Sequence, residues 1–440
     1  MMANPWGDYL ADGHEEFSLR YLLALIEDED EDNDELEEMA QFLATMTEAK
    51  NERNIKWKHQ RLNWNEHVDK LVHEESFAAK YRMSLDAFNT LLELLRIMIT
   101  PDLFKARNSC DEPIYPEMVM AIGLRWLGGG SHHDLMDAYN LSKSSVYRSR
   151  DTFLDAVIAC NALEIRFPQT PLELEDVRKR FAAKSTNNVM RGCVGALDGL
   201  LARINQPSNA ECEGNPRSYH SGHYNDYGLN VQAICDARLR FLFFAVAAPG
   251  GTGDLVAYEF LSIRDIIEGL PDGIYIVADA AYMLSEHVLV PFTGGDRQAA
   301  DFDTFNYFLS QLRIRIEMAF GLFTTKWRVV RRHLETKLTN SSKVLEACAR
   351  LHNFVIDQDS DDDFDEDDES NHYQNRIKVM DQSPLGWGYL PTVQPLETIP
   401  GTSRTRDAIV RHVSRNGYRR PAENVERRIR ELHELEPPLM

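Results

Sequence analysis

Two aspartates follow short apolar runs that resemble buried strands. Asp198 comes directly after residues 193–197 (CVGAL), and Asp279 comes directly after residues 274–278 (IYIVA). An unpaired carboxylate in such surroundings is costly, so each acid is expected to have a cationic partner. The carboxyl ends of strands are also where open α/β sheets place their ligands. For Asp198 taken alone, an Asp-Gly turn whose carboxylate caps backbone amides stays an open alternative.

A third acid, Glu317, belongs to a predicted helix. It follows Ile316 by about 100° of helical rotation, so it lies on the flank of an apolar stripe that is typical of a helix packed on a sheet. Taken by itself, Glu317 is better explained by an i,i+4 surface pair with Arg313. The stripe consists of Phe305, Phe308, Leu309, Leu312, Ile316, Ala319, Phe320, Phe323 and Trp327.

The chemistry of a metal-dependent nuclease accounts for the three acids together. Hard oxygen ligands can hold two Mg²⁺ ions roughly 4 Å apart, one activating water or a 3′-hydroxyl and the other stabilising the leaving oxygen. Bound cations would also neutralise the buried carboxylates and remove their cost. The sequence therefore predicts Asp198, Asp279 and Glu317 as catalytic residues and metal ligands.

The elements that must position these acids belong to a mixed α/β region. Beyond residue 191, short β-rich runs alternate with helical segments, whereas the preceding region is helical, with Ser84 as a candidate N-cap and a further helix from Pro116. The predicted β-rich runs cover residues 193–197, 229–235, 241–248 and 274–277. The predicted domains are an acidic leader at 1–53, a helical domain at 54–185, the α/β domain at 186–356, an acidic linker at 357–370, and a C-terminal extension at 371–440 with short helices at 404–412 and 422–435.

Two acidic runs carry most of the formal net charge of −22. Residues 27–38 and 357–369 each contain ten Asp or Glu, together 20 of the 70 in the chain. Blocks of like charge repel themselves, so we expect both runs to be solvated and to lie outside the folded parts. Residues 311–352, in contrast, contain nine Lys or Arg and three Glu, a local charge of +6 that suits a DNA backbone.

Residues 134–153 have the outline of a helix-turn-helix. A short helix precedes a turn at Asn140-Leu141, and Ser142 is placed to cap a second helix whose apolar residues face inward. An ordinary helical bundle or a partner-binding surface explains this segment equally well. The side chains predicted to contact DNA, here and in residues 311–352, are Lys143, Arg148, Arg150, Arg313, Lys326, Arg328, Arg331 and Arg332.

The order of several short motifs resembles a known family. They are GALDG (195–199), YGLNVQAICD (227–236), ADAAY (278–282), RIRIEMAFG (313–321), KWR (326–328) and LHN (351–353), with FAAKYRMS (77–84) and LRWLGGGS (124–131) upstream. No single motif is specific, but their order resembles the endonuclease domain of Harbinger-type DDE transposases over most of residues 192–356. The resemblance implies a ribonuclease H-like mixed sheet with flanking helices, preceded by an all-helical domain. It also places the family's catalytic triad on Asp198, Asp279 and Glu317.

The same resemblance implies an activity and its partners. A protein of this kind nicks or cuts double-stranded DNA at transposon ends and transfers strands with two divalent ions, Mg²⁺ or Mn²⁺. Such elements commonly rely on a separate Myb-like protein for DNA binding and nuclear entry, so a nuclear location is expected, with a cytoplasmic one until that partner binds as the alternative. The oligomeric state is open, a homo-oligomer included. The alternative function is that of a domesticated DNA- or partner-binding protein that keeps the fold with little or no catalysis.

One segment departs from the family pattern. The family usually has a His/Asn-Asp-Ser step after a Pro-Gly turn, whereas this chain reads PGGTGDL at residues 249–255. We interpret the retained Asp254 as the N-cap of the following helix rather than as a metal ligand. His220 and His223 with Asp226 suggest a second metal site, but a surface loop is the better interpretation because no further ligand cluster accompanies them.

The composition of the chain bears on membrane spans, secretion signals and disulfides. The longest apolar run, residues 241–248, is far shorter than the roughly 18 residues that suggest a membrane span. Residues 1–17 are polar and acidic and lack the features of a secretory signal. The six cysteines form no C-x-x-C pair and no dense disulfide pattern, so we interpret them as buried thiols.

Overall fold

The described part of this computed structural model comprises residues 61–101, 113–294, 299–358 and 403–421. All of them belong to one unit that begins at Arg61. The acidic leader, Cys110, most of the acidic linker and the predicted helix at 422–435 lie outside the described residues.

Short helices form the first described region, and local sequence signals set where several of them begin. The Ser84 hydroxyl accepts a hydrogen bond from the Ala87 amide at 3.1 Å, so the predicted cap is confirmed, and Pro116 is the first residue of its helix as predicted. The hydroxyls of Tyr81 and Tyr139 lie 3.1 Å apart inside this region. The helices are α3 (Trp64–His73), α4 (Phe77–Tyr81), α5 (Leu85–Ile99), α7 (Pro116–Leu127), α8 (His132–Tyr139) and α9 (Lys143–Ala159).

The predicted helix-turn-helix geometry is present in α8 and α9. Asn140 ends α8 in a left-handed conformation, with φ of 50°. Ser142 then caps α9 by accepting from the Ser145 amide at 3.3 Å. Val146, Phe153 and Val157 are buried, as their spacing predicted.

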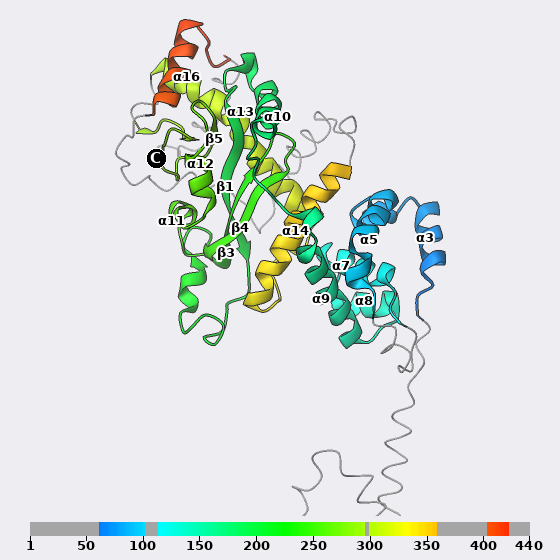
Figure 1. Ribbon diagram of the computed structural model, residues 1–440. Helices are drawn as coiled ribbons and strands as arrows, with labels where there is room; N and C mark the ends of the chain where they lie inside the picture. Colours follow the sequence, from blue (N-terminus) through cyan, green and yellow to red (C-terminus); the bar gives the residue numbers. More distant parts are fainter. Residues whose placement is uncertain (1–60, 102–112, 295–298, 359–402, 422–440) are drawn as a thin grey trace, which may run out of the picture. The chain divides into compact units, whose positions relative to one another are not determined.

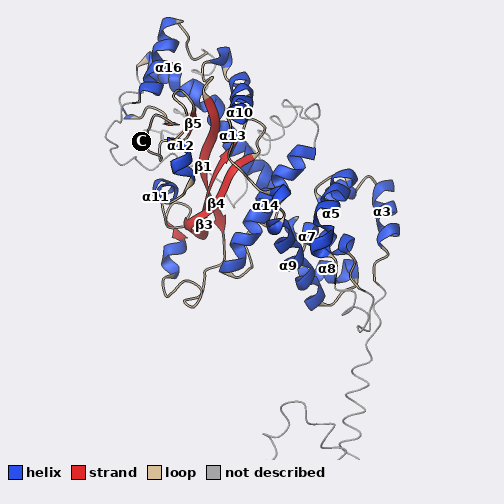
Figure 2. Cartoon of the chain, in the orientation of Figure 1, coloured by secondary structure: helices blue, strands red, loops and turns tan. Residues whose placement is uncertain are grey.

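A mixed sheet forms the centre of the α/β region (Figure 2). The strand order is β2-β3-β1-β5-β6, and β4 pairs with β3. β1 is antiparallel to β3 and parallel to β5, which is in turn parallel to β6. This arrangement matches the expected ribonuclease H-like sheet. The strands are β1 (Cys193–Arg203), β2 (His220–Ser221), β3 (Asp226–Cys235), β4 (Phe241–Pro249), β5 (Tyr275–Val277) and β6 (Val288–Leu289).

Helices cover the sheet and connect it to the first region (Figure 1). The 27-residue α13 (Ala300–Lys326) crosses β1, β3 and β5, and all nine residues of its predicted apolar stripe are buried. α14 (Leu338–Gln358) contacts both β4 and α9. α10 (Pro171–Lys184), which the sequence assigned to the helical domain, packs against β1. Two short helices, α11 (Asp254–Glu259) and α12 (Ile263–Glu268), lie between β4 and β5.

Two predicted boundaries shift in the structure. β1 does not end at residue 197 but continues to Arg203, because residues 198–203 pair with β3. The Asp-Gly turn considered for Asp198 is therefore wrong, since both residues are inside a strand. Asp357 and Gln358, placed in the acidic linker, are the last residues of α14, and Asp357 pairs with Arg240 at 2.9 Å.

The C-terminal extension contributes one helix to the folded region. α16 (Arg404–Arg415) begins where the sequence predicted and packs against α13. Its first turn is capped by Glu286, whose carboxylate accepts from the Arg404 and Thr405 amides at 2.9 and 3.1 Å. Arg419 and Arg420 pair with Asp301 and Asp303 near the start of α13.

Candidate active site

Asp198 lies within β1, and Asp279 lies two residues after the end of the neighbouring parallel strand β5. Ala196 of β1 pairs with Val277 of β5, and each aspartate follows its paired residue by two positions. Neighbouring strands are about 4.8 Å apart, so the two aspartates lie close to each other beside the C-terminal end of β5. The strand positions predicted for these two acids are thus confirmed.

The pKa values of the Asp198 and Asp279 carboxyl groups indicate that these two groups lie close together. Burial raises the pKa of Asp198 to about 8, and the charge of Asp279 contributes in the same direction. Burial also raises the pKa of Asp279, opposed by a hydrogen bond from the Ala281 amide and by Arg313. Arg313 lowers the pKa of Asp198 as well, so this arginine is the cationic partner that we predicted from the sequence for the two aspartates.

A third aspartate belongs to the same cluster. Asp254 was predicted to cap α11, but Gly253 occupies the N-cap position and Asp254 is the first helical residue. Its Oδ1 atom accepts hydrogen bonds from the side-chain amides of Asn230 and Gln232, both at 2.9 Å. The charge of Asp254 raises the pKa values of Asp198 and Asp279. The capping interpretation was wrong because two amides on β3 orient this carboxylate toward the sheet.

A buried polar network fixes the position of Asp254. The Tyr282 hydroxyl donates to Oε1 of Gln232 at 2.6 Å, and Nε2 of Gln232 also donates to Asn230 Oδ1 at 2.8 Å. Nδ2 of Asn230 also donates a hydrogen bond to the Thr252 carbonyl at 2.9 Å. Gln232 and Tyr282 are almost fully buried, so the amides beside Asp254 have little freedom to rotate.

Glu317 is placed on α13, the helix that crosses the sheet, and forms an ion pair with Arg313. Each of these two side chains is 22% exposed, so the pair is only partly accessible to solvent. The charge of Glu317 raises the pKa of Asp279, which places the glutamate in the electrostatic neighbourhood of the aspartates. The i,i+4 pair with Arg313, which was the simpler interpretation of Glu317, is therefore present. It lies beside the acid cluster, which consists of Asp198, Asp254 and Asp279.

The donor atoms of this acid cluster suit a hard cation. In the described part of the chain, no group of three His, Cys, Asp or Glu side chains is arranged to hold a metal ion. Individual carboxylate oxygens instead accept hydrogen bonds, Asp198 from the Gly199 amide and Asp279 from the Ala281 amide, both at 2.8 Å. Burial, and after it the charge of Asp279, raises the pKa of Asp198, and carboxylate oxygens gathered in this way fit a divalent ion.

The predicted DNA-contacting side chains occupy different environments. Lys143 and Arg148 are exposed on α9, and Arg328, Arg331 and Arg332 are exposed after α13. Lys326 is half-buried in the last turn of α13. Arg313 is engaged with Glu317 and so differs from an ordinary phosphate-binding side chain.

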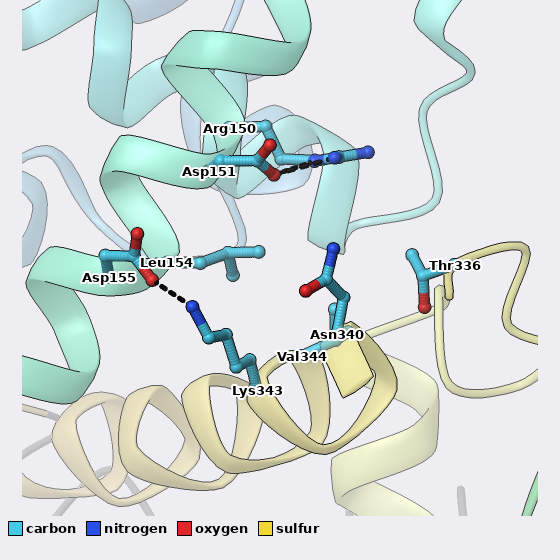
Figure 3. Close-up of a pocket in the computed structure, with 8 residues that line it drawn as sticks. All are labelled: Arg150, Asp151, Leu154, Asp155, Thr336, Asn340, Lys343 and Val344. Atoms are coloured by element: carbon cyan, nitrogen blue, oxygen red, sulfur yellow. Dashed lines mark hydrogen bonds and ion pairs between the residues drawn. The ribbon is translucent and has the colours of Figure 1, made fainter. Parts of the chain in front are cut away.

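Arg150 is enclosed by its neighbours. Its guanidinium lies over the rings of Trp126 and Tyr147, at 4.9 and 4.6 Å from their centroids, and pairs with Asp151. It lines a cavity of about 170 Å³ between α9 and α14, where Lys343 also pairs with Asp155 (Figure 3). The charges in this cavity are paired, and the residues that line it include none of the acid cluster.

The hairpin between β2 and β3 contains no third partner for a second metal site. Asp226 is paired with His333 at 2.9 Å and Arg203 at 3.4 Å, and His223 is exposed in the turn. The surface-loop interpretation agrees with these contacts. The same turn carries Tyr224, 47% of which is exposed, although burial of its hydroxyl raises its pKa and the charges of the acid cluster raise it further. No spacing signal in the sequence marks Tyr224 as a neighbour of the acids.

The cysteines and the helix lengths can also be compared with what the sequence predicts. Cys160, Cys193, Cys212, Cys235 and Cys348 are buried free thiols, as predicted for the described cysteines. None of the described helices is both long enough and apolar enough to span a membrane.

Comparison with known proteins identifies the segment that contains the acids. Residues 197–353 match the family model of the DDE superfamily endonuclease, a segment that runs from β1 into α14. No curated protein and no solved structure matches the chain. The matched segment includes Asp198, Asp254, Asp279 and Glu317 and covers a little over a third of the sequence. Residues 197–353 therefore form a domain of the DDE superfamily endonuclease type. This match supports the interpretation of the domain as a DDE transposase-like nuclease.

Proposed function

We propose that this protein is a metal-dependent DNA endonuclease of the Harbinger type, which nicks or cuts transposon ends and transfers strands. The observation that carries the proposal is the placement of Asp198 on β1 and of Asp279 directly beyond the end of β5, within a DDE superfamily endonuclease segment. Asp198 and Asp279 are half-buried neighbours whose pKa values are raised even though Arg313 acts on both, and divalent ions would offset this concentration of negative charge.

Asp198, Asp279 and Glu317 would hold two divalent ions, Mg²⁺ or Mn²⁺, with Asp254 beside them. When bound, such ions activate water or a 3′-hydroxyl and stabilise the leaving oxygen of a phosphodiester. The protein's own part is positioning: β1 and β5 fix the backbones of the two aspartates, and Asn230 and Gln232 fix Asp254. Arg313 offsets part of the negative charge of Asp198 and Asp279 and holds Glu317 in an ion pair, so it would position the glutamate beside the two aspartates.

The substrate that follows from this chemistry is double-stranded DNA. The helix-turn-helix of α8 and α9 and the basic residues after α13 offer exposed cations for its phosphates. In the same proposal a separate Myb-like protein assists DNA recognition, the site of action is the nucleus, and the active form is open to a homo-oligomer. The Myb-like partner and the nuclear location are implied by the resemblance to Harbinger-type transposases.

The decisive test is cleavage by acid variants. With Mg²⁺ or Mn²⁺, a matching terminal repeat and the DNA-binding partner, the protein should nick DNA and leave a 3′-hydroxyl, and chelation should stop the reaction. Asp198→Asn, Asp279→Asn and Glu317→Gln should each abolish cleavage while keeping folding and DNA binding, because they preserve side-chain volume and remove charge.

Two outcomes would change the proposal. If these variants cut as well as the parent, the triad is wrong. If the parent binds its element's ends but never cuts them, the domesticated DNA-binding function replaces the nuclease. Asp272→Asn is a matched control, because this exposed aspartate lies in the turn before β5 and takes no part in the acid cluster.

A further inference from the structure

Three arginines from two distant parts of the sequence meet at one glycine turn: Arg82 from the first part, and Arg328 and Arg332 from the second. The turn, residues 128–130, joins α7 to α8 and belongs to the LGGG motif, which the proposed active site does not use. Arg82 donates through Nη2 to the Gly128 carbonyl at 3.0 Å, and Arg332 donates through Nη2 to the Gly129 carbonyl at 3.4 Å. Arg328 packs against Gly129, where an added Cβ would lie 3.0 Å from the Arg328 Cβ.

The glycines make this convergence feasible. Gly129 has φ of 99°, a conformation that side chains other than glycine rarely adopt. A Cβ on Gly128 would lie 3.0 Å from Nε of Arg82, so a larger residue would crowd the guanidinium. The turn therefore exposes its carbonyls to two arginines and gives the third space to pack.

The positive charges in this cluster have no carboxylate partner in the described part of the chain. Neither Arg82, Arg328 nor Arg332 forms an ion pair there, and Nε of Arg82 is buried without a hydrogen-bond acceptor. Burial and the neighbouring charge of Arg328 lower the pKa of Arg82. Asp134, an acid of the adjacent α8, is used by the capping box with Ser131. The cluster therefore concentrates positive charge that no carboxylate of the described residues offsets, and its exposed members Arg328 and Arg332 can attract an anion.

The cluster also joins the two functional regions. The Val329 amide donates to the Leu127 carbonyl at 3.1 Å, which fixes the segment after α13 against the end of α7. Ser131 directly follows the turn and begins the first helix of the helix-turn-helix. An anion bound here would therefore contact both the helix-turn-helix side and the nuclease side of the protein.

We propose that Arg82, Arg328 and Arg332, gathered around the glycine turn, form a binding site for a backbone phosphate of duplex DNA. This inference rests on the proposed nuclease function and names a site outside its acid cluster. Arginine is suited to it because its planar fork can donate two hydrogen bonds to one phosphate. By holding the backbone where the two regions meet, the site would set the register of DNA between α9 and the catalytic sheet.

The test measures binding of a short labelled duplex in the presence of a chelator, so that cleavage cannot contribute. The Arg328→Ala, Arg332→Ala double variant changes two exposed side chains, and its melting temperature should match the parent. We expect binding about tenfold weaker at low salt. The slope of log affinity against log salt should fall in magnitude by about 0.9 for each phosphate that the variant no longer neutralises.

A matched control removes the same charge elsewhere. Arg411 and Arg415 are exposed on α16, which docks near Asp301 and Asp303 at the start of α13, whereas Arg328 follows the end of that helix. The two ends of a 27-residue helix are roughly 40 Å apart, so the Arg411→Ala, Arg415→Ala variant should bind DNA like the parent. Equal losses in both variants would mean a general charge effect and would overturn the site.

The remaining outcomes separate the site from the nuclease function. If the parent binds DNA and the Arg328→Ala, Arg332→Ala variant keeps its salt slope, the site is wrong while the nuclease proposal stands. If the parent binds no duplex, the phosphate site is wrong, and the nuclease proposal is decided by the cleavage test with the DNA-binding partner. Tripolyphosphate binding tests whether the ligand is instead a free anion. If the Arg328→Ala, Arg332→Ala variant loses affinity for tripolyphosphate but binds the duplex like the parent, the DNA assignment is wrong.

Discussion

The carboxylate of Asp254 occupies the space in which a side chain on residue 199 would lie. A Cβ built on Gly199 would stand 2.2 Å from Oδ1 of Asp254, 2.7 Å from its Cγ and 2.9 Å from Nε2 of Gln232. Gly199 follows Asp198 on β1, so the glycine of the Asp-Gly pair makes room for a second acid beside the first. The conformational freedom of glycine is not needed here, because residue 199 lies in a regular strand.

Gly199→Ala should therefore damage the acid cluster. The added methyl must displace Asp254 or Gln232, and such overpacking typically costs about 1–3 kcal/mol of unfolding free energy. Cleavage should fall together with stability, measured by nicking assays and urea unfolding. Gly222→Ala is the matched control, because a Cβ at Gly222 meets nothing within 4 Å. Parent-like activity and stability in Gly199→Ala would contradict the packing described here.

The raised pKa of Asp198 predicts a pH dependence of stability in metal-free protein. Between the ordinary pKa of 3.8 and about 8, folded Asp198 keeps a proton that the unfolded chain has released. The free energy of unfolding should consequently fall as pH rises through this window, by at most about 1.4 kcal/mol per pH unit. Asp198→Asn should flatten this dependence in urea unfolding measured with a chelator. An unchanged slope in the variant would assign the effect to other groups.

Divalent ions should stabilise the protein through the same carboxylates. At an Mg²⁺ or Mn²⁺ concentration about 100 times the dissociation constant, binding adds about 2.7 kcal/mol, or roughly 5 °C in melting temperature. The rise should be small in Asp198→Asn and Asp279→Asn when each variant is compared with and without metal, whereas Asp272→Asn should behave like the parent. Equal rises in all four proteins would place metal binding elsewhere.

Local patterns predicted backbone positions better than side-chain directions. The runs before Asp198 and Asp279 indicated their strands, and the stripe that includes Ile316 indicated α13, because burial and strand or helix periodicity are local properties. The orientation of Asp254 depends on Asn230 and Gln232, which lie 24 and 22 residues away in the chain.

Long-range contacts explain the other differences as well. Arg150 looked available to DNA from its helical position, but Trp126 and Tyr147 enclose its guanidinium. The strands β2 and β6 have only two residues each, too few to produce a periodic signal. The docking of α16 depends on Glu286, an acid 118 residues before Arg404, and no motif connects the two.

Glu286 should control whether α16 stays docked. Hydrogen bonds from the Arg404 and Thr405 amides lower its pKa to about 2, so the charged form is favoured in the folded protein. This contribution is present above the ordinary pKa of 4.5 and is lost as pH falls toward 2. Glu286→Ala should expose residues 404–415 to limited proteolysis at neutral pH while the sheet stays protected. Asp407→Ala, at an exposed position on the same helix, is the control; equal protection in both variants would show that the cap is dispensable.

Two substitutions at Asp254 separate its structural contribution from its charge. Asp254→Ala leaves the buried amides of Asn230 and Gln232 without this acceptor and should cost about 1–3 kcal/mol of unfolding free energy. Asp254→Asn still offers an oxygen to both donors, so urea unfolding should show a much smaller loss.

The same Asp254→Asn protein tests chemistry, because it removes one negative charge beside Asp198 and Asp279. As a group that supports the metal ligands, Asp254 should reduce cleavage by about 10- to 100-fold when neutralised, less than the loss expected for Asp198→Asn. A loss equal to that of Asp198→Asn would make Asp254 a ligand in its own right. Full activity in a stably folded Asp254→Asn protein would mean that this carboxylate serves only to satisfy the two amides, and the acid cluster would then reduce to Asp198, Asp279 and Glu317.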